Sequence, residues 1–174
     1  MSISLKILKL QELDKKLIKN ICNLKRTFWK FSLNSHLKWF KNFVKKNDVH
    51  ILLYNKKILI GYNLLRTRTF FKNSYKTSNK YFYFDTLIIA KKYRGKNFSK
   101  RIIEKSLKIS KKNDLPIILI CQKKSVNFYK KYEFELINNN KVQFVDHKFN
   151  TCCMIYSRSK NLFFNTKFRI FTKK

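Results

Sequence analysis

Basic side chains cluster around a glycine in the segment DTLIIAKKYRGKNFS, which runs from Asp85 to Ser99. The segment is expected to hold the end of a buried strand, a basic turn and the beginning of a helix. The first amide groups of a helix lack partners inside the helix, and the helix dipole is positive there. The segment therefore predicts an anion site, most often for phosphate, to which Lys92, Arg94 and Lys96 add charge. An ordinary strand-to-helix turn with solvated lysines is the alternative.

Few other side chains are candidates for proton transfer or covalent chemistry. Asp85 is a lone carboxylate in an apolar strand, so it is either a general base or the partner of a nearby lysine. His36 and His147 are weaker candidates, because a lone histidine is more often structural or solvated. Cys121 is expected to be an inert thiol, since no activating neighbour is visible.

The pattern of cysteines and histidines argues against a metal site. No two cysteines form a CxxC pair and the histidines are scattered, so no metal cofactor is expected. The first segment, MSISLKILKLQELDKK, carries too many charges for a signal peptide. No run of about 20 apolar residues could span a membrane. A cytoplasmic protein without a transmembrane segment is therefore expected.

The chain has 174 residues, of which 41 are Lys or Arg and 9 are Asp or Glu, so its formal net charge is +32. Such a charge is typical of nucleic-acid-binding proteins, because phosphates attract clustered cations. Only seven of the cations are arginines, however, and arginine is the better ligand for phosphates and bases. The favoured explanation of the high positive charge of this basic protein is composition bias together with a general preference for anionic ligands. Nucleic-acid binding stays open without being favoured.

The apolar pattern predicts the elements that must position these residues. A hairpin is followed by a half in which strands and helices alternate, which favours a mixed α/β sheet with helices on both faces. Strands are expected over 2–10, 81–89, 116–121, 134–138, 141–146 and 152–157, and a hairpin over 49–70. Helices are expected over 13–24, 35–44 (capped by Ser32 or Asn34), 98–112 and 125–132, and a polar loop over 72–80.

The run LIIAKKYRGKNFSKRII, residues 87–103, resembles the acyl-CoA signature of the GNAT superfamily of N-acyltransferases. In that family a strand leads into an Arg/Gln-x-x-Gly-x-Gly/Ala turn, whose amides hold the pyrophosphate of coenzyme A. Arg94 takes the Arg/Gln position, and Gly95 matches an extra glycine of a looser form. Asn97 and Ser99 stand where the family has glycine and glycine or alanine. Asparagine tolerates positive φ, and serine is small.

Two further segments are similar to the same family. Residues 119–134 resemble its second signature, in which Phe128 and Tyr129 match a Phe-Tyr pair and Glu133 replaces a glycine. Gly61, in KKILIGYNLL, stands where the third strand of the family has a glycine. The segment HLKWF resembles members that act on amino sugars of surface polysaccharides.

The resemblance implies a GNAT-like fold, in which a mostly antiparallel sheet splays at the cofactor strands and has helices on both faces. It implies one acyltransferase domain over residues 1–156, followed over 157–174 by a basic, aromatic tail that is a final strand or an extension. Acetyl-CoA is the implied cosubstrate, with its pantetheine paired to the strand backbone before the turn. The residues implied to contact it are Leu87, Ile88, Ile89, Arg94, Gly95, Lys96, Asn97, Phe98, Ser99 and Gln122.

The resemblance also implies a reaction, in which a deprotonated primary amine attacks the thioester carbonyl of acetyl-CoA directly. Tyr129 is implied to protonate the leaving thiolate, a role that a phenol within hydrogen-bond reach can fill. Packing of Tyr129 on Val126 and Tyr132 is the alternative. Asp85 lies on the strand beneath the implied acyl site and stays the candidate base.

The function is left open among three classes, of which the first two differ in the acceptor of the acetyl group. A small-molecule amine, either an amino sugar or a nucleotide-linked sugar, is favoured, since a nucleotide diphosphate suits a basic surface. A peptide or protein amine is the alternative. The third class is a non-enzymatic module that binds nucleic acid. The tail SRSKNLFFNTKFRIFTKK supports it, because mixed cations and aromatics suit single strands or an anionic membrane surface. A homodimer is compatible with these classes.

Overall fold

The computed structural model describes residues 2–72, 78–138, 142–144, 151–157, 168–170 and 172. The chain groups into two compact units that alternate along the sequence. The first unit comprises Met1–Arg66 and Asp85–Ser106, and the second comprises Thr67–Phe84 and Leu107–Lys174. The expected single domain over residues 1–156 and the expected tail over 157–174 stay predictions.

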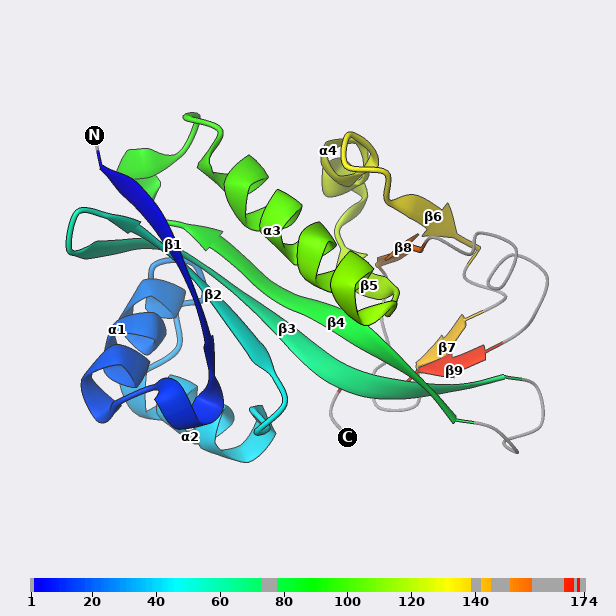
Figure 1. Ribbon diagram of the computed structural model, residues 1–174, viewed down its shortest axis with the longest axis horizontal. Coiled ribbons are helices and arrows are strands. Elements are labelled where there is room, and N and C mark those ends of the chain that lie inside the picture. Colours follow the sequence, from blue (N-terminus) through cyan, green and yellow to red (C-terminus); the bar gives the residue numbers. More distant parts are fainter. Residues whose placement is uncertain are drawn as a thin grey trace. The chain divides into compact units, whose positions relative to one another are not determined.

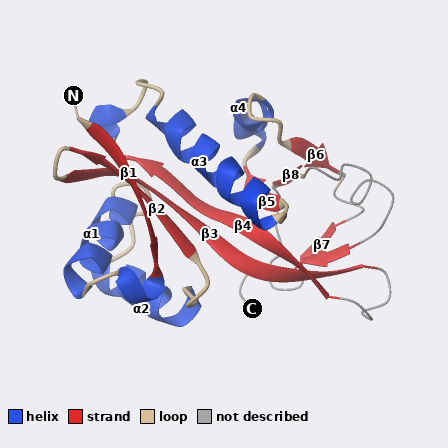
Figure 2. Ribbon diagram, in the orientation of Figure 1, coloured by secondary structure: helices blue, strands red, loops and turns tan. Residues whose placement is uncertain are grey.

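Four strands follow one another in the sheet of the first unit: β1 (Ile3–Lys9), β2 (Val49–Asn55), β3 (Ile58–Lys72) and β4 (Ser78–Ile89). β2 pairs with both β1 and β3 in antiparallel register. β3 and β4 are long strands (Figure 2), and each also contributes residues to the second unit. The expected hairpin between β2 and β3 is confirmed, and Lys56 at its turn has a φ of 54°, which glycine would adopt more easily.

Two helices, α1 (Lys15–Arg26) and α2 (Leu33–Phe43), cover one face of this sheet (Figure 1). Asp14 caps α1 and Ser32 caps α2, each by accepting a hydrogen bond from a backbone amide of the first turn. Ser32 is thus the cap, and not Asn34. The core on this face combines apolar side chains of both helices with alternate residues of the strands: Ile21, Cys22, Leu24, Phe40, Leu52, Tyr62, Leu64 and Ile88.

The opposite face carries the first turns of α3 (Phe98–Asn113). Gly61 of β3 lets this helix approach the sheet closely. A Cβ atom at Gly61 would lie 2.8 Å from Ile89 Cδ1 and 3.1 Å from Ile102 Cδ1, so a larger residue would push both side chains away. Helices on both faces of the sheet confirm the expected architecture.

In the second unit, β5 (Ile117–Cys121) runs parallel to β4, with Phe82 opposite Ile117 and Tyr83 opposite Ile118. β8 (Cys152–Tyr156) lies between β5 and β6 (Glu135–Ile137) and is antiparallel to both. The described pairings are therefore mixed and mostly antiparallel, as expected. The splay at the cofactor strands stays a prediction.

The remaining elements are short. α4 (Val126–Lys130) precedes β6 in the chain, and β7 (Val142–Phe144) pairs in parallel with β9 (Phe168–Ile170). β9 also pairs with β3 in antiparallel register. The described residues also form the 3-10 helices η1 (Leu10–Glu12), η2 (Lys91–Tyr93) and η3 (Lys123–Ser125).

The polar loop expected over 72–80 is shorter in the structure. β3 continues to Lys72 and β4 begins at Ser78, so polar residues at both ends of this segment are paired as strand. Residues 73–77 and His147 lie outside the described residues, and so does most of the tail.

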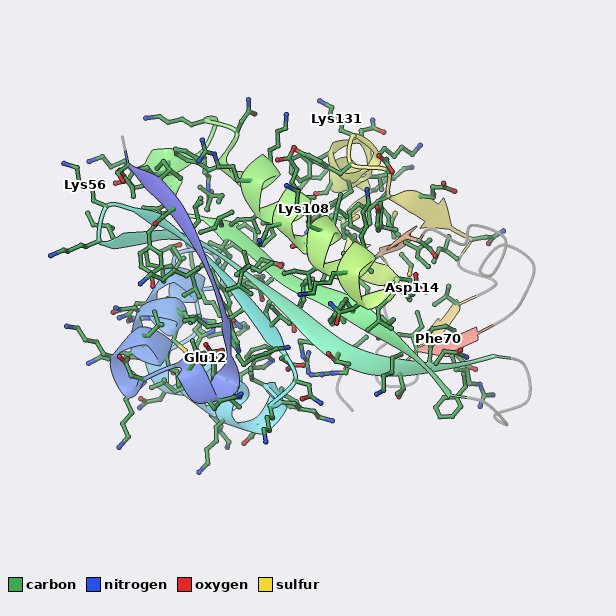
Figure 3. All side chains as sticks on the ribbon, viewed as in Figure 1. Glu12, Lys56, Phe70, Lys108, Asp114 and Lys131 are labelled. Carbon is green, nitrogen blue, oxygen red and sulfur yellow. The ribbon has the colours of Figure 1, made fainter. Side chains whose placement is uncertain are left out.

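Exposed lysines cover much of the surface, among them Lys56, Lys108 and Lys131 (Figure 3). Over the described ranges, no helix is long and apolar enough to cross a membrane. The same ranges contain no group of three or more His, Cys, Asp or Glu side chains placed to hold a metal ion.

Candidate functional site

The turn between β4 and α3 has the backbone conformation that an anion site needs. η2 follows the end of β4, and Gly95 then has a φ of 76° and Asn97 a φ of 56°. Both values lie in the left-handed region, which glycine and asparagine adopt more readily than other residues. The tolerance of Asn97 for positive φ is therefore confirmed. α3 begins at the next residue, Phe98, so its first amides belong to this turn.

A hollow of about 200 Å³ lies at this turn. It brings together seven of the ten predicted cofactor residues and adds Tyr93, which the sequence analysis missed. Ile88 packs in the core beneath α1 and α2, so only its backbone is available to a ligand. Lys96 is exposed and does not line the hollow. The lining residues are Leu87, Ile89, Tyr93, Arg94, Gly95, Asn97, Phe98 and Ser99.

Arg94 fixes the turn against the end of the strand. Its Nε donates a hydrogen bond to the Ile89 carbonyl at 3.0 Å, and its guanidinium lies 5.9 Å from the ring centre of Phe28. Among the described residues, no partner accepts a hydrogen bond from its two Nη atoms. These donors are therefore free for an anion in the hollow.

We expect Asn97→Val to reduce stability by about 1–2 kcal/mol, because a β-branched residue is strained at this positive φ. Urea unfolding measures the loss. Asn97→Gly is the matched control and should be at least as stable as the wild type. Equal stability of the valine variant would mean that the turn does not hold residue 97 in the left-handed region.

A second hollow, of about 360 Å³, lies between α1, α2 and β4 within the first unit. Two consecutive β4 residues line it, Asp85 and Thr86, and the next residue along β4, Leu87, lines the first hollow. The two hollows therefore share one strand. The complete lining is Lys25, Trp29, Phe31, Ser35, His36, Trp39, Asp85 and Thr86.

Asp85 forms an ion pair, but with an arginine of the neighbouring strand. Its Oδ2 accepts a hydrogen bond from Arg66 Nη1 at 2.8 Å, and its Oδ1 accepts one from the Thr86 hydroxyl at 3.2 Å. The side chains of Arg66 and Asp85 are only 4% and 17% exposed. Both carboxylate oxygens are thus engaged, which favours the ion-pair interpretation of Asp85 over a general base.

Lys25 of α1 is the charged residue of this hollow that the sequence analysis missed. It is only 5% exposed, and its Nζ lies 3.5 Å from the ring centre of Trp39 and 5.8 Å from that of Trp29. Burial lowers the pKa of Lys25 to about 8, and the charge of Asp85 partly opposes this shift. The sequence did indicate that Lys25 is buried, because Lys25 continues the helical row of Ile18 and Cys22 that faces the core.

Both histidines in the described part of the chain have structural partners. His36 lines the second hollow, and its Nε2 lies 3.1 Å from the Trp29 carbonyl. The Nδ1 atom of His50 lies 2.8 Å from the Tyr62 hydroxyl. Burial lowers the pKa of His50 to about 3, so this side chain is neutral at physiological pH.

Tyr129 and Gln122 belong to the second unit and are described there. The Tyr129 ring lies 5.1–6.1 Å from the ring centres of Phe84, Phe128 and Phe134. Burial strongly raises the pKa of Tyr129, with a smaller effect of Cys121, so its phenol keeps its proton. Gln122 is exposed.

Two further residues of the second unit, Cys121 and Glu133, bear on the expectations from the sequence. Burial raises the pKa of the Cys121 thiol to about 11, which is consistent with the expected inert thiol. Glu133, which replaces a glycine of the resembled signature, has a φ of 63°. The backbone there thus keeps the left-handed conformation that a glycine adopts more readily.

Comparisons with known proteins agree on one family. The profile of the acetyltransferase (GNAT) domain matches residues 11–149. Glucosamine 6-phosphate N-acetyltransferase 1 of Dictyostelium discoideum is 31% identical over 121 residues, which are 66% of this chain and 74% of that protein.

Solved structures show the same fold at low identity. Escherichia coli ElaA is 16% identical with a TM-score of 0.66, and the match covers 90% of this chain and 100% of that chain. Arabidopsis thaliana Naa50, in complex with the bisubstrate analogue CoA-Ac-MVNAL, is 20% identical with a TM-score of 0.63, over 90% and 99%. An acyl-CoA N-acyltransferase from Pseudomonas aeruginosa is 12% identical with a TM-score of 0.65, over 88% and 97%.

Proposed function

The chain is a member of the GNAT acetyltransferase family, and on that premise we propose that it transfers the acetyl group of acetyl-CoA to the primary amine of an amino sugar. N-acetyltransferase activity follows from the family. The amino-sugar acceptor is supported by the relative from Dictyostelium discoideum, whose name specifies glucosamine 6-phosphate. Three finer proposals are independent of the experiment below. They are a nucleotide-linked sugar as the acceptor, a cytoplasmic location and a homodimer.

The observation that carries the proposal is the turn between β4 and α3. A Cβ atom at Gly95 would meet nothing within 4 Å, so the backbone of the turn is open to a ligand. The free Nη atoms of Arg94 and the first amides of α3 are donors for a pyrophosphate. These residues fit coenzyme A, with its pyrophosphate at the turn and its pantetheine along the backbone of Leu87–Ile89.

The second hollow is the proposed acceptor site. Asp85 and Thr86 precede Leu87 in β4, so a pantetheine that runs along the strand away from the turn leads toward these two residues. The walls are mainly aromatic, and the faces of Trp29 and Trp39 suit the flat, apolar side of a sugar ring. Polar side chains in the lining, among them Ser35 and His36, can orient the ring.

In the proposed reaction, the acceptor ammonium first gives a proton to solvent, and the free amine bonds to the thioester carbonyl carbon. The carbon–sulfur bond breaks, and the sulfur of coenzyme A takes a proton from the Tyr129 hydroxyl. The new amide nitrogen releases its extra proton to solvent, and Tyr129 regains a proton from solvent. The buried phenol of Tyr129 is protonated in the free protein, so it carries the proton that this step needs.

Acetyl-CoA binding, measured by isothermal titration calorimetry, tests the proposed function. Arg94→Ala removes charge-assisted hydrogen bonds worth about 1.5–3 kcal/mol each, so we expect binding to weaken about 10- to 100-fold. Lys108→Ala removes the charge of an exposed lysine far along α3 from the turn and is the matched control. It should bind like the wild type. A wild-type protein that binds no acetyl-CoA would refute the function, and full binding by Arg94→Ala would remove Arg94 from the site.

A further inference from the structure

Lys25 is buried and has no hydrogen-bonding partner among the residues that the structure describes. It is 5% exposed and lines the second hollow, yet its Nζ makes no hydrogen bond or salt bridge with any residue that the structure describes. The ammonium group faces the hollow and has exchanged much of its water for the indole rings of Trp39 and Trp29. Its three N–H donors therefore need an acceptor that the described chain does not supply.

The charges around the hollow leave Lys25 in excess. Asp85 attracts Lys25, but its Oδ2 already bonds Arg66, so two cations share one carboxylate. Cys22 on α1 stays neutral, because burial raises the pKa of its thiol. His36 on α2 bonds the Trp29 carbonyl. The described side chains facing the hollow thus leave one positive charge without a counterpart, which a ligand can supply.

We propose that Lys25 binds the phosphate of a phosphorylated amino-sugar acceptor, while the indoles of Trp29 and Trp39 hold the sugar ring. The proposal rests on the proposed function and names the substrate class of the same site. Phosphate accepts several hydrogen bonds at once, so it matches an ammonium with three free donors. An unphosphorylated amino sugar would leave the charge of Lys25 buried and unpaired.

The binding of such an acceptor should depend on pH. The pKa of Lys25 in the free protein is about 8, lowered by burial and by Arg66 and raised by Asp85 and Cys22. Lys25 is therefore mostly charged at pH 7 and loses its proton as the pH rises through 8. Affinity for the phosphorylated sugar should fall about tenfold per pH unit well above pH 8, while affinity for the unphosphorylated sugar should not fall with it.

The chain has two tryptophans, and both line this hollow, so intrinsic fluorescence reports binding here without any turnover. The probes are glucosamine 6-phosphate and glucosamine, titrated into the full chain. Lys25→Met is expected to weaken the binding of glucosamine 6-phosphate about 10- to 100-fold and to leave glucosamine unchanged. Lys25→Arg keeps the charge and should recover most of the affinity. Lys19→Met, an exposed position of the same helix, is the matched control.

Thermal unfolding at pH 7 checks that the variants are folded. Lys25→Met should unfold no earlier than the wild type, because it removes a buried charge. The proposal is overturned if Lys25→Met binds glucosamine 6-phosphate as tightly as the wild type, or if the wild type does not prefer this sugar over glucosamine. It is also overturned if Lys25→Met lowers kcat equally for both sugars at unchanged affinity, which would make Lys25 a proton acceptor.

The acetyl-CoA calorimetry separates this proposal from the proposed function. Lys25-dependent binding of glucosamine 6-phosphate without acetyl-CoA binding would support the phosphate site and refute the transferase. Acetyl-CoA binding without preference for the phosphorylated sugar would refute the phosphate site and leave the transferase standing.

Discussion

Asp85→Asn is expected to lower the free energy of unfolding by about 3–5 kcal/mol, because it leaves a buried arginine without its counter-charge. The Arg66 side chain is 4% exposed and donates to Asp85 Oδ2 at 2.8 Å and to the Phe43 carbonyl at 3.1 Å. Asparagine keeps the size of the side chain and removes its charge, so the loss reports the ion pair. Urea unfolding followed by circular dichroism measures it.

Two variants sharpen this experiment. Glu104→Gln removes an exposed ion pair, in which Lys100 Nζ lies 3.8 Å from Glu104 Oε1, and should cost less than about 0.5 kcal/mol. Asp85→Asn combined with Arg66→Met removes both charges and should recover much of the stability. An Asp85→Asn protein that is as stable as the wild type but catalytically dead would instead favour the carboxylate as a general base.

Tyr129→Phe should lower kcat by about 10²- to 10⁴-fold while leaving acetyl-CoA affinity unchanged, because it removes only the proton donor. The ring keeps its contacts with Phe84, Phe128 and Phe134, so folding should be preserved. Steady-state kinetics with glucosamine 6-phosphate, together with calorimetry, separate the two effects.

Tyr132→Phe is the matched control, since Tyr132 lies one turn further along the same segment and has no proposed role. Its kcat should stay within about twofold of the wild type. Full turnover by Tyr129→Phe would assign Tyr129 to the aromatic packing of the second unit and leave the thiolate to be protonated by water.

The turn between β4 and α3, the proposed anion turn, could be predicted from the sequence because its causes are local. A glycine, an asparagine and a helix start stand within four residues of one another, and each limits the backbone by its own chemistry. The positive φ values of Gly95 and Asn97 therefore follow from residue type. The same reasoning predicted the hairpin of β2 and β3 and gave Ser32 as one of two candidate caps of α2.

The second hollow could not be predicted in this way, because it depends on contacts distant in the chain. Lys25 and Trp39 are 14 positions apart and meet only when α1 packs beside α2. For Asp85 the sequence left open a general base or an ion pair with a nearby lysine. The partner in the structure is Arg66 of β3, and only the pairing of strands brings the two residues together.

Gly61 has a consequence for any map of this protein made by mutational scanning. A side chain at this position would collide with Ile89, which lines the hollow at the anion turn. Substitutions at Gly61 should therefore alter cofactor affinity, although the residue has no side chain to touch a ligand. In a scan scored by activity, substitutions at Gly61 would lower activity as substitutions of the binding residues do. The active site mapped in this way would therefore include a residue that lies behind the lining of the hollow and does not touch the ligand.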